Sequence, residues 1–214
     1  VMIFNLEMSK EEVTKRILCA ESEVDSTKVK NATLESEDWL KLGEASGRLS
    51  DMPIYIDDTP GLTSAELRAK CRKAKLEKNI GLVIIDYLQL MESKNKSSSR
   101  QQEVSEISRS LKILAKELNI PVIALSQLSR ATESRTDHRP MLSDLRESGS
   151  IEQDADIVMF LHREDYYDAN TEKKNVAEVI IAKNRSGSTG TVELAWIPEY
   201  TKFANLYRGP DIND

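Results

Sequence analysis

The chain has 214 residues, of which 39% are hydrophobic and 31% charged, and its formal net charge is −6 at pH 7. This composition is typical of a soluble globular protein with one large domain and excludes the disordered and fibrous classes. The negative charge disfavours a surface that coats duplex DNA, although it leaves room for a narrow basic strip that faces single-stranded nucleic acid.

The hydropathy of the chain and its cysteine, histidine and aromatic content exclude or disfavour further kinds of protein and site. No stretch resembles a transmembrane run or a signal peptide, so the cytoplasm is the expected location. Cys19 and Cys71 have no Cys or His at metal-like spacing, which predicts two buried, reduced thiols. His138 and His162 are the only histidines, so a histidine metal cluster is excluded. The low aromatic content of 5% disfavours a base-stacking platform.

Strands and helices alternate through the first two thirds of the chain. Apolar runs predict strands at residues 1–4, 53–56, 82–85 and 121–125. Capping residues and apolar stripes predict helices from Ser9 to about Cys19, from a cap at Ser36 through Leu40, over 63–78 and over 101–118. This alternation indicates a mostly parallel α/β sheet that is covered by helices on both faces.

The last third is rich in strands. Apolar runs predict strands at 157–161 and 176–182, and a turn at 187–190 leads into a return strand at 191–197 and an edge strand near 203–206. These are expected to form antiparallel hairpins at the carboxy-terminal end of a single domain, 1–214. Residues 92–100 are Ser- and Lys-rich and predict a mobile loop.

Two charged segments are open to more than one interpretation. The helix at 63–78 carries a basic outer face, which is either a solvated surface or a functional one. Residues 130–150 are polar, lack a clean period and include Arg130, Arg135, Arg139 and Arg146. They form either a solvated loop or a surface that contacts a phosphate backbone.

A single acid follows the most apolar strand of the chain. Gly81 introduces the run from Leu82 to Ile85, which reads as a strand buried on both faces, and Asp86 comes directly after it. Burying an unpaired carboxylate costs several kcal/mol, roughly, so this acid needs a cation, a donor or water. Asp86 therefore either holds Mg²⁺ through the water molecules bound to the metal, or caps a loop or helix.

Similar polar residues follow other predicted strands. In an open α/β sheet, ligands bind beyond the carboxyl ends of the strands, which here hold Glu7, Asp86, Gln127, Lys183 and Arg185. Each alone has an ordinary explanation, because exposed cations are usually solvated and a glutamine after a strand is commonly a turn residue. Together they supply acids, an amide and cations, a set that favours phosphoryl transfer.

Several long motifs carry a family resemblance. They are FNLEMS (residues 4–9), IDYLQL (85–90), RQQEVSEISRSLK (100–112), ALSQLSR (124–130), RPMLSDLRESGSIEQDAD (139–156) and IAKNRSG (181–187). They resemble the motor domain of bacterial replicative DNA helicases of the DnaB type. The resemblance implies a RecA-like fold and a homo-hexameric ring that uses ATP and Mg²⁺ to translocate on single-stranded DNA.

The resemblance also implies roles for the residues at the strand ends. Glu7 resembles the general base that orients the attacking water. Asp86 matches the Walker B aspartate, which holds Mg²⁺ through water. Gln127 matches the residue that couples nucleotide state to the DNA-facing loops. Lys183 and Arg185 resemble the pair that reaches the γ-phosphate bound by the neighbouring subunit.

A second set of implied contacts concerns DNA and other proteins. Arg146, Glu147 and Gly149 lie in the segment with which the family contacts the DNA backbone. Main-chain amides near Gly149 and a helix start at Ser148 or Ser150 would suit a phosphate. A primase and a helicase loader are the further partners that the resemblance implies.

Two parts of the family's pattern are not in the printed sequence. None of its eight glycines is followed by lysine, so it holds no phosphate-binding loop of the form G-x-x-x-x-G-K-[ST]. The family's amino-terminal scaffold domain is missing as well. Without the Walker A strand, we expect a gap between the strand at Val122 and that at Ile157, whose unpaired backbone groups would be destabilising. We therefore expect residues 1–214 to be a helicase fragment with little or no ATPase activity alone.

Two competing interpretations remain open at this point. One is a RecA-like ATPase of the recombinase or circadian type, which the segments at 139–156 and 183–185 fit less well. The other is a non-catalytic module that keeps the fold in order to bind a partner, which only the missing phosphate loop favours.

Overall fold

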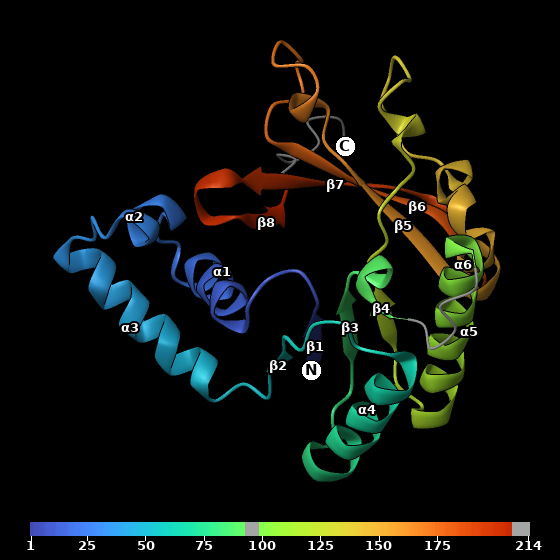
Figure 1. Cartoon of the computed structure of the whole chain (residues 1–214). Helices are drawn as coiled ribbons and strands as arrows, with labels where there is room; N and C mark the ends of the chain where they lie inside the picture. The colour runs from blue at the N-terminus through green and yellow to red at the C-terminus, as the bar shows by residue number, and fades with distance from the viewer. Residues whose placement is uncertain (93–98, 207–214) are drawn as a thin grey trace, which may run out of the picture. The chain divides into compact units, whose positions relative to one another are not determined.

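The computed structural model of the chain describes residues 1–92 and 99–206, apart from the side chains of residues 146–148. The chain forms two compact units (Figure 1). The first comprises Val1–Lys15, Gly47–Glu133 and Leu142–Ala155, and the second comprises Arg16–Ser46, Ser134–Met141 and Asp156–Asp214. Most of the predicted loop at 92–100, namely residues 93–98, lies outside the described part.

The first unit is built on a four-stranded parallel sheet. Its strand order is β2 (Tyr55–Asp57), β1 (Met2–Asn5), β3 (Val83–Asp86), β4 (Val122–Ala124). The prediction of four parallel strands is confirmed, with ends shifted by one or two residues. β3 lies between two partners, which explains why its sequence is the most apolar.

One face of this sheet forms the core of the unit. Phe4, Val83 and Ile85 are fully buried there, whereas Ile84 is only half-buried. Successive residues of a strand point to opposite faces, so β3 is fully buried on one face and half-buried on the other, whereas its sequence predicts burial on both faces. The buried residues pack against apolar side chains of helices α4 (Ser64–Lys78) and α5 (Arg100–Leu118).

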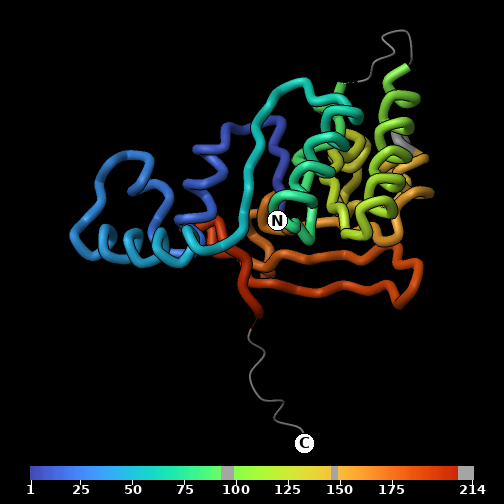
Figure 2. The backbone as a smooth tube through the Cα atoms, turned by 90° about the horizontal axis from the view of Figure 1, so that it is seen from below, coloured from blue at the N-terminus to red at the C-terminus, as the bar shows by residue number. Residues whose placement is uncertain are grey.

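Helices α4 and α5 lie side by side (Figures 1 and 2). Capping boxes at Thr63 and Ser99 begin them, and asparagines in the left-handed conformation end them. α5 carries the predicted stripe, because Val104, Ile107, Leu111 and Leu114 are all buried. Ser108, also buried, donates a 2.8 Å hydrogen bond to Asp154 at the end of α6 (Gly149–Asp154).

The second unit is built on an antiparallel sheet. Its order is β5 (Ile157–His162), β6 (Val176–Asn184), β7 (Gly190–Ile197), β8 (Lys202–Asn205). The long β6–β7 hairpin runs from orange to red-orange, as a ribbon in Figure 1 and as a tube in Figure 2. The predicted hairpin and the predicted edge strand are both confirmed. Short 3₁₀ turns complete the chain at Leu88–Leu90, Arg130–Thr132, Leu142–Ser148, Glu164–Tyr166 and Pro198–Tyr200.

Three helices precede β2 in the chain. α1 (Lys10–Ser22) begins with the predicted capping box of Ser9 and Glu12 and runs three residues beyond the predicted end. α2 (Ser26–Asn31) was not predicted. α3 (Ser36–Ser50) includes Ser36, so the prediction that Ser36 is the cap is wrong. Asp38 performs the capping, since it accepts a 3.0 Å hydrogen bond from the Glu35 amide.

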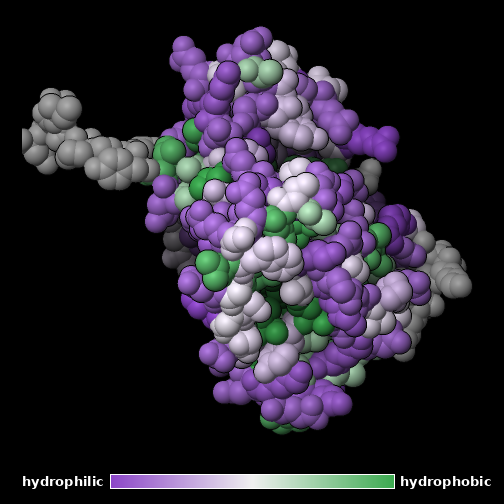
Figure 3. All heavy atoms as spheres, turned by 90° about the vertical axis from the view of Figure 1, so that its left-hand side faces the viewer, coloured by the Kyte–Doolittle hydropathy of each residue, from purple (hydrophilic) through white to green (hydrophobic). Residues whose placement is uncertain are grey.

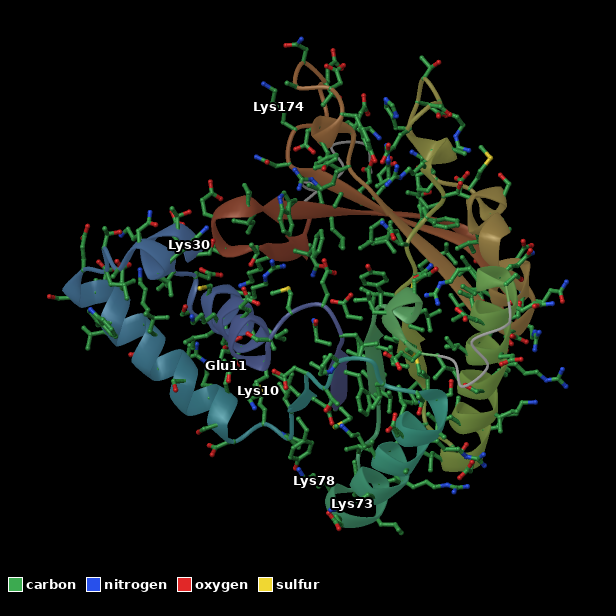
Figure 4. All side chains as sticks on the ribbon, in the orientation of Figure 1. Lys10, Glu11, Lys30, Lys73, Lys78 and Lys174 are labelled. Atoms are coloured by element: carbon green, nitrogen blue, oxygen red, sulfur yellow. The ribbon has the colours of Figure 1, made fainter. Side chains whose placement is uncertain are left out.

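The basic face of α4 is tied to the rest of the first unit. Arg68 and Arg72 both pair with Glu117 of α5, and Lys70 pairs with Asp57 at 2.6 Å. Lys73, Lys75 and Lys78 contact, in turn, Glu77, the Ile80 carbonyl oxygen and the Tyr55 ring. Lys73 and Lys78 project from α4 in Figure 4. These contacts favour the interpretation of this face as a structural and solvated one.

Each sheet exposes apolar residues on an edge strand. Ile123 and Leu125 are exposed at β4, and Ile157, Met159 and Leu161 are exposed on β5. Within the described residues, β4 pairs only with β3, and β5 pairs only with β6. That a further strand belongs between β4 and β5 stays a prediction.

The remaining composition-based expectations concern the surface and the thiols. None of the described helices combines the length and the apolar character that a membrane span requires. Hydrophilic residues dominate the face in Figure 3, with groups of hydrophobic residues between them. Cys19 and Cys71 are free and buried, as predicted. Burial raises the pKa of the Cys71 thiol to about 12, which makes it unreactive at neutral pH.

A buried acid anchors the segment Ser134–Met141 to the second sheet. Glu178 of β6 is 6% exposed and pairs with Arg139 and, at 3.0 Å, with Lys173. The His138 ring stacks on Tyr167 at a centroid distance of 4.4 Å. Burial raises the pKa of Glu178, but the hydrogen bonds from Lys173 and Arg139 outweigh burial and hold it below its usual 4.5.

We expect Glu178→Gln to lower the free energy of unfolding by roughly 2 kcal/mol at neutral pH, because Arg139 loses its acid partner and Lys173 keeps only Glu193, at 3.1 Å. This value is below the roughly 3–5 kcal/mol of a fully buried pair, because the Arg139 and Lys173 side chains are 40% and 46% exposed. The folded pKa is depressed, so this stabilisation is complete above the unfolded value of 4.5. It is lost as the pH falls through the lower folded value.

Denaturant titration would measure the free energy of unfolding at each pH. The protein to use is the natural full-length polypeptide, meaning the gene product that contains residues 1–214. The difference between wild type and Glu178→Gln should shrink between about pH 5 and pH 3. Glu172→Gln, which changes an exposed acid of the preceding loop, is the matched control. Equal stability of wild type and Glu178→Gln at neutral pH would contradict the expectation.

Candidate functional site

Three parallel strands of the first unit end at one edge of the sheet. Asn5 of β1 lies opposite Asp86 of β3, and Ile85 lies opposite Ala124 of β4. Backbone hydrogen bonds continue this register past the strand ends, from the Leu6 amide to the Asp86 carbonyl oxygen at 2.7 Å and from the Leu88 amide to the Leu125 carbonyl oxygen at 2.9 Å. This edge therefore brings together Glu7, Asp86 and Gln127.

The side chain of Asn5 joins the Asp86 carboxylate to the main chain at Glu7. Its Nδ2 donates a 3.1 Å hydrogen bond to Oδ2 of Asp86. Its Oδ1 accepts hydrogen bonds from the amides of Glu7 and Met8, at 3.2 and 2.7 Å. The Glu7 side chain is exposed, whereas Asp86 is half-buried. The main chain that carries Glu7 is thus held by the amide that also holds the Asp86 carboxylate.

The Asp86 carboxylate fits a metal that is bound largely through water. Its Oδ1 makes no hydrogen bond to any residue that the structure describes. Among the described residues, no three His, Cys, Asp or Glu side chains are grouped to hold a metal. Mg²⁺ commonly keeps several waters and uses one or two carboxylates plus substrate phosphates. One carboxylate with an open oxygen meets that requirement.

A second amide, Gln89, holds the main chain at Gln127. Nε2 of Gln89 donates to Ser126 Oγ at 3.0 Å and to the Gln127 carbonyl oxygen at 3.2 Å, and its Oε1 accepts from the Gln127 amide at 3.2 Å. Arg100, the first residue of α5, donates to the Gln89 carbonyl oxygen. The Gln127 side chain is exposed and makes no hydrogen bond within the described residues. It is therefore available to a ligand.

The two predicted cations belong to the second unit. Lys183 is half-buried on β6 opposite Val158, and Arg185 follows the end of β6. The Arg185 amide donates to the Asp156 carbonyl oxygen at 2.8 Å, and its guanidinium pairs with the Asp156 carboxylate at 3.2 Å. Both side chains of this pair are more than half exposed. The structure brings these two cations together at one strand end, in a different unit from the edge that holds Glu7.

The predicted DNA-contacting segment follows β4. Arg146 and Glu147 lie in the 3₁₀ turn Leu142–Ser148, and their side chains lie outside the described part. Gly149 is exposed and is the first residue of α6, one position from either predicted helix start. The carbonyl oxygen of the buried residue Asp144 accepts a 3.0 Å hydrogen bond from the Ser129 amide. That bond connects this segment to the one that follows Gln127.

Sequence reasoning missed the two amides, Asn5 and Gln89. A signal for each was present, because Asn5 is a polar residue that ends an apolar strand and Gln89 follows Asp86 within the same motif. However, Asn5 is 81 residues from Asp86, and Gln89 is 38 residues from Gln127.

A sequence profile described as the DnaB-like helicase C-terminal domain matches residues 1–205. The chain belongs to this family. The resemblance drawn from the motifs is therefore confirmed.

Relatives of the DnaB-like family are similar over nearly the whole chain. It is 58% identical to "Replicative DNA helicase DnaC" of Bacillus subtilis (strain 168) and to "Replicative DNA helicase DnaB" of Geobacillus stearothermophilus, over 209 residues that cover 97% of the chain. The chain spans 46% of the length of each of these two relatives. More than half of each relative therefore has no counterpart in residues 1–214.

Solved structures agree with the DnaB-like fold. "The Structure Of A DnaB-Like Replicative Helicase And Its Interactions With Primase" superposes with a TM-score of 0.92 at 50% identity, covering 96% of this chain and 50% of that one. A second solved structure, described as an ATPase domain, gives the same TM-score and identity, covering 96% of this chain and 74% of that one. The predicted RecA-like architecture of parallel sheet, flanking helices and antiparallel strands is confirmed.

Proposed function

We propose that residues 1–214 act as one RecA-like motor domain of an ATP-dependent replicative DNA helicase. The protein would unwind duplex DNA by translocating on single-stranded DNA as a homo-hexameric ring. The observation that carries this proposal is the meeting of Glu7, Asp86 and Gln127 at one sheet edge, in a chain of the DnaB-like helicase family. That the two bacterial relatives are described as replicative DNA helicases supports the proposed activity.

The site residues have distinct chemical tasks in this proposal. When bound, Mg²⁺ neutralises charge on the β- and γ-phosphates of ATP. Asp86 would orient the water shell of the metal with its open Oδ1. Glu7 would accept the proton of the attacking water, and its exposed carboxylate supports that role. No residue of 1–214 is assigned to cradle the remaining phosphates, because the printed sequence holds no G-x-x-x-x-G-K-[ST] loop.

Lys183 and Arg185 would act on the nucleotide of a neighbouring subunit. Their place at a strand end and the high exposure of the Arg185–Asp156 pair support this role. An exposed pair of this kind contributes little to stability, so Arg185 can exchange the Asp156 carboxylate for a phosphate at little cost.

Gln127 would transmit the state of the nucleotide to the DNA-contacting segment. Gln89 fixes the main chain of Gln127, and the Ser129–Asp144 hydrogen bond lies between Gln127 and Arg146 along the chain. Arg146, Glu147 and Gly149 would then contact the phosphate backbone of the bound strand. The partners proposed for the whole protein are a primase, which the description of one structural relative supports, and a helicase loader. Its proposed location is the cytoplasm.

Binding of single-stranded DNA tests the proposal directly. We expect Arg146→Ala in the natural full-length polypeptide to weaken binding of a fluorescent oligonucleotide, and to reduce the slope of log K against log salt by about 0.7 per lost phosphate contact. Arg109→Ala, which changes an exposed arginine on α5, is the matched control. Binding by Arg146→Ala with an unchanged salt slope would contradict a DNA-contacting role.

A further inference from the structure

Asn5 is the buried polar residue at the centre of the candidate site. Its side chain is 4% exposed, and β1 holds it in register with Asp86 of β3. Both ends of its amide are used, since Nδ2 donates to Asp86 while Oδ1 accepts from the amides of Glu7 and Met8. No other described side chain bonds to both of these segments.

An amide suits this position for a chemical reason. It supplies a donor and an acceptor from one rigid, neutral group. Its donor occupies Oδ2 of Asp86 and leaves Oδ1 without a hydrogen bond to any described residue. Its acceptor fixes the turn after β1, and this turn sets the direction in which the Glu7 side chain leaves the sheet. Alanine would remove both effects, and aspartate would remove only the first.

We propose that Asn5 is a positioning residue that holds the general base and the metal-orienting acid in one fixed arrangement. This inference rests on the proposed function, because it assigns Asn5 a task in ATP hydrolysis through Glu7 and Asp86. It goes further by making the two acids depend on a single neutral side chain. Losing Asn5 therefore alters two properties together, namely turnover and the requirement for Mg²⁺.

The first test is Asn5→Ala in the natural full-length polypeptide. A hydrogen bond to a charged group contributes about 1.5–3 kcal/mol, which corresponds to roughly a 10- to 100-fold change. We expect kcat for ATP hydrolysis to fall by about that factor, and the half-saturating Mg²⁺ concentration to rise severalfold. A purely structural role would lower the melting temperature and leave the Mg²⁺ dependence unchanged.

Ser108→Ala is the matched control. It also removes a hydrogen bond between a buried side chain and a carboxylate of the first unit, but it touches neither Glu7 nor Asp86. We expect it to lower the melting temperature without shifting the Mg²⁺ dependence. A shift in Ser108→Ala equal to that in Asn5→Ala would overturn the proposal, because general loosening of the unit would then explain both.

Asn5→Asp separates the two tasks of the amide and decides the matter if Asn5→Ala does not fold. Aspartate keeps an acceptor for the amides of Glu7 and Met8, but it places a second carboxylate beside Asp86. Asp86 then loses its hydrogen-bond donor and faces a like charge. We expect the half-saturating Mg²⁺ concentration of Asn5→Asp to differ severalfold from that of wild type. A Mg²⁺ dependence equal to that of wild type would overturn the proposal.

Glu7→Gln distinguishes failure of this inference from failure of the proposed function. If Glu7→Gln is inactive while both Asn5 variants behave as wild type, the proposed function stands and the role of Asn5 is wrong. If Glu7→Gln turns over ATP at the rate of wild type, the proposed function fails and the inference fails with it.

Discussion

Glu7→Gln in the natural full-length polypeptide is expected to lower kcat for ATP hydrolysis by about 10²- to 10⁴-fold, the usual contribution of a general base. Glutamine has the same shape but cannot accept a proton from the attacking water. The Glu7 side chain is exposed and its main-chain amide supplies the hydrogen bond to Asn5. Folding and nucleotide affinity should therefore remain those of wild type.

Phosphate release would measure turnover, and a fluorescent nucleotide would measure binding. Glu11→Gln is the matched control, because Glu11 is an exposed acid in the first turn of α1 (Figure 4). Turnover by Glu7→Gln within a few-fold of Glu11→Gln would show that another group is the base. Loss of nucleotide binding together with turnover would show that Glu7 is needed for the site to form.

The second large effect is expected for Arg185→Ala. An arginine that stabilises the transferring phosphoryl group contributes about 10³- to 10⁵-fold to kcat, and alanine removes that group. Arg185→Lys should recover little of the loss, because lysine lacks the planar fork of donors. The exposed Lys174 (Figure 4) provides the charge-matched control, Lys174→Ala.

Co-expression with Glu7→Gln tests whether Arg185 acts on a neighbouring subunit. Each variant alone is expected to be inactive. A mixed ring contains interfaces at which an intact Glu7 faces an intact Arg185, so it should regain part of the activity. Activity of the mixture no higher than that of the two separate variants would place Arg185 beside the Glu7 of its own subunit.

Local patterns in the sequence predicted most of the fold. The stripe on α5, the capping box at Ser9 and the apolar run of β3 each depend on residues that are close in the chain. α2 escaped prediction because its six residues have no buried stripe, and its ends are set by Asp25 and by Ala32 in the left-handed conformation. Neither signal is distinctive without the surrounding structure.

Part of the candidate site could also be predicted from local sequence patterns, and part could not. The positions of Glu7, Asp86 and Gln127 followed from the rule that ligands gather at strand ends, and the rule required only that the strands be recognised. The groups that hold them could not be predicted, because the bond between Asn5 and Asp86 depends on the parallel pairing of β1 with β3. The partners of the α4 cations were hidden for the same reason, since Glu117 is 49 residues from Arg68.

The strand orders of the two sheets have a consequence for how the chain folds as it is synthesised. All strands of the parallel sheet lie before residue 125, and all strands of the antiparallel sheet lie after residue 156. Because domains generally fold as units in the order in which they leave the ribosome, we expect the edge that holds Asp86 to assemble before β6 exists. The acids would then be in place early, and the two cations would arrive with the last part of the chain.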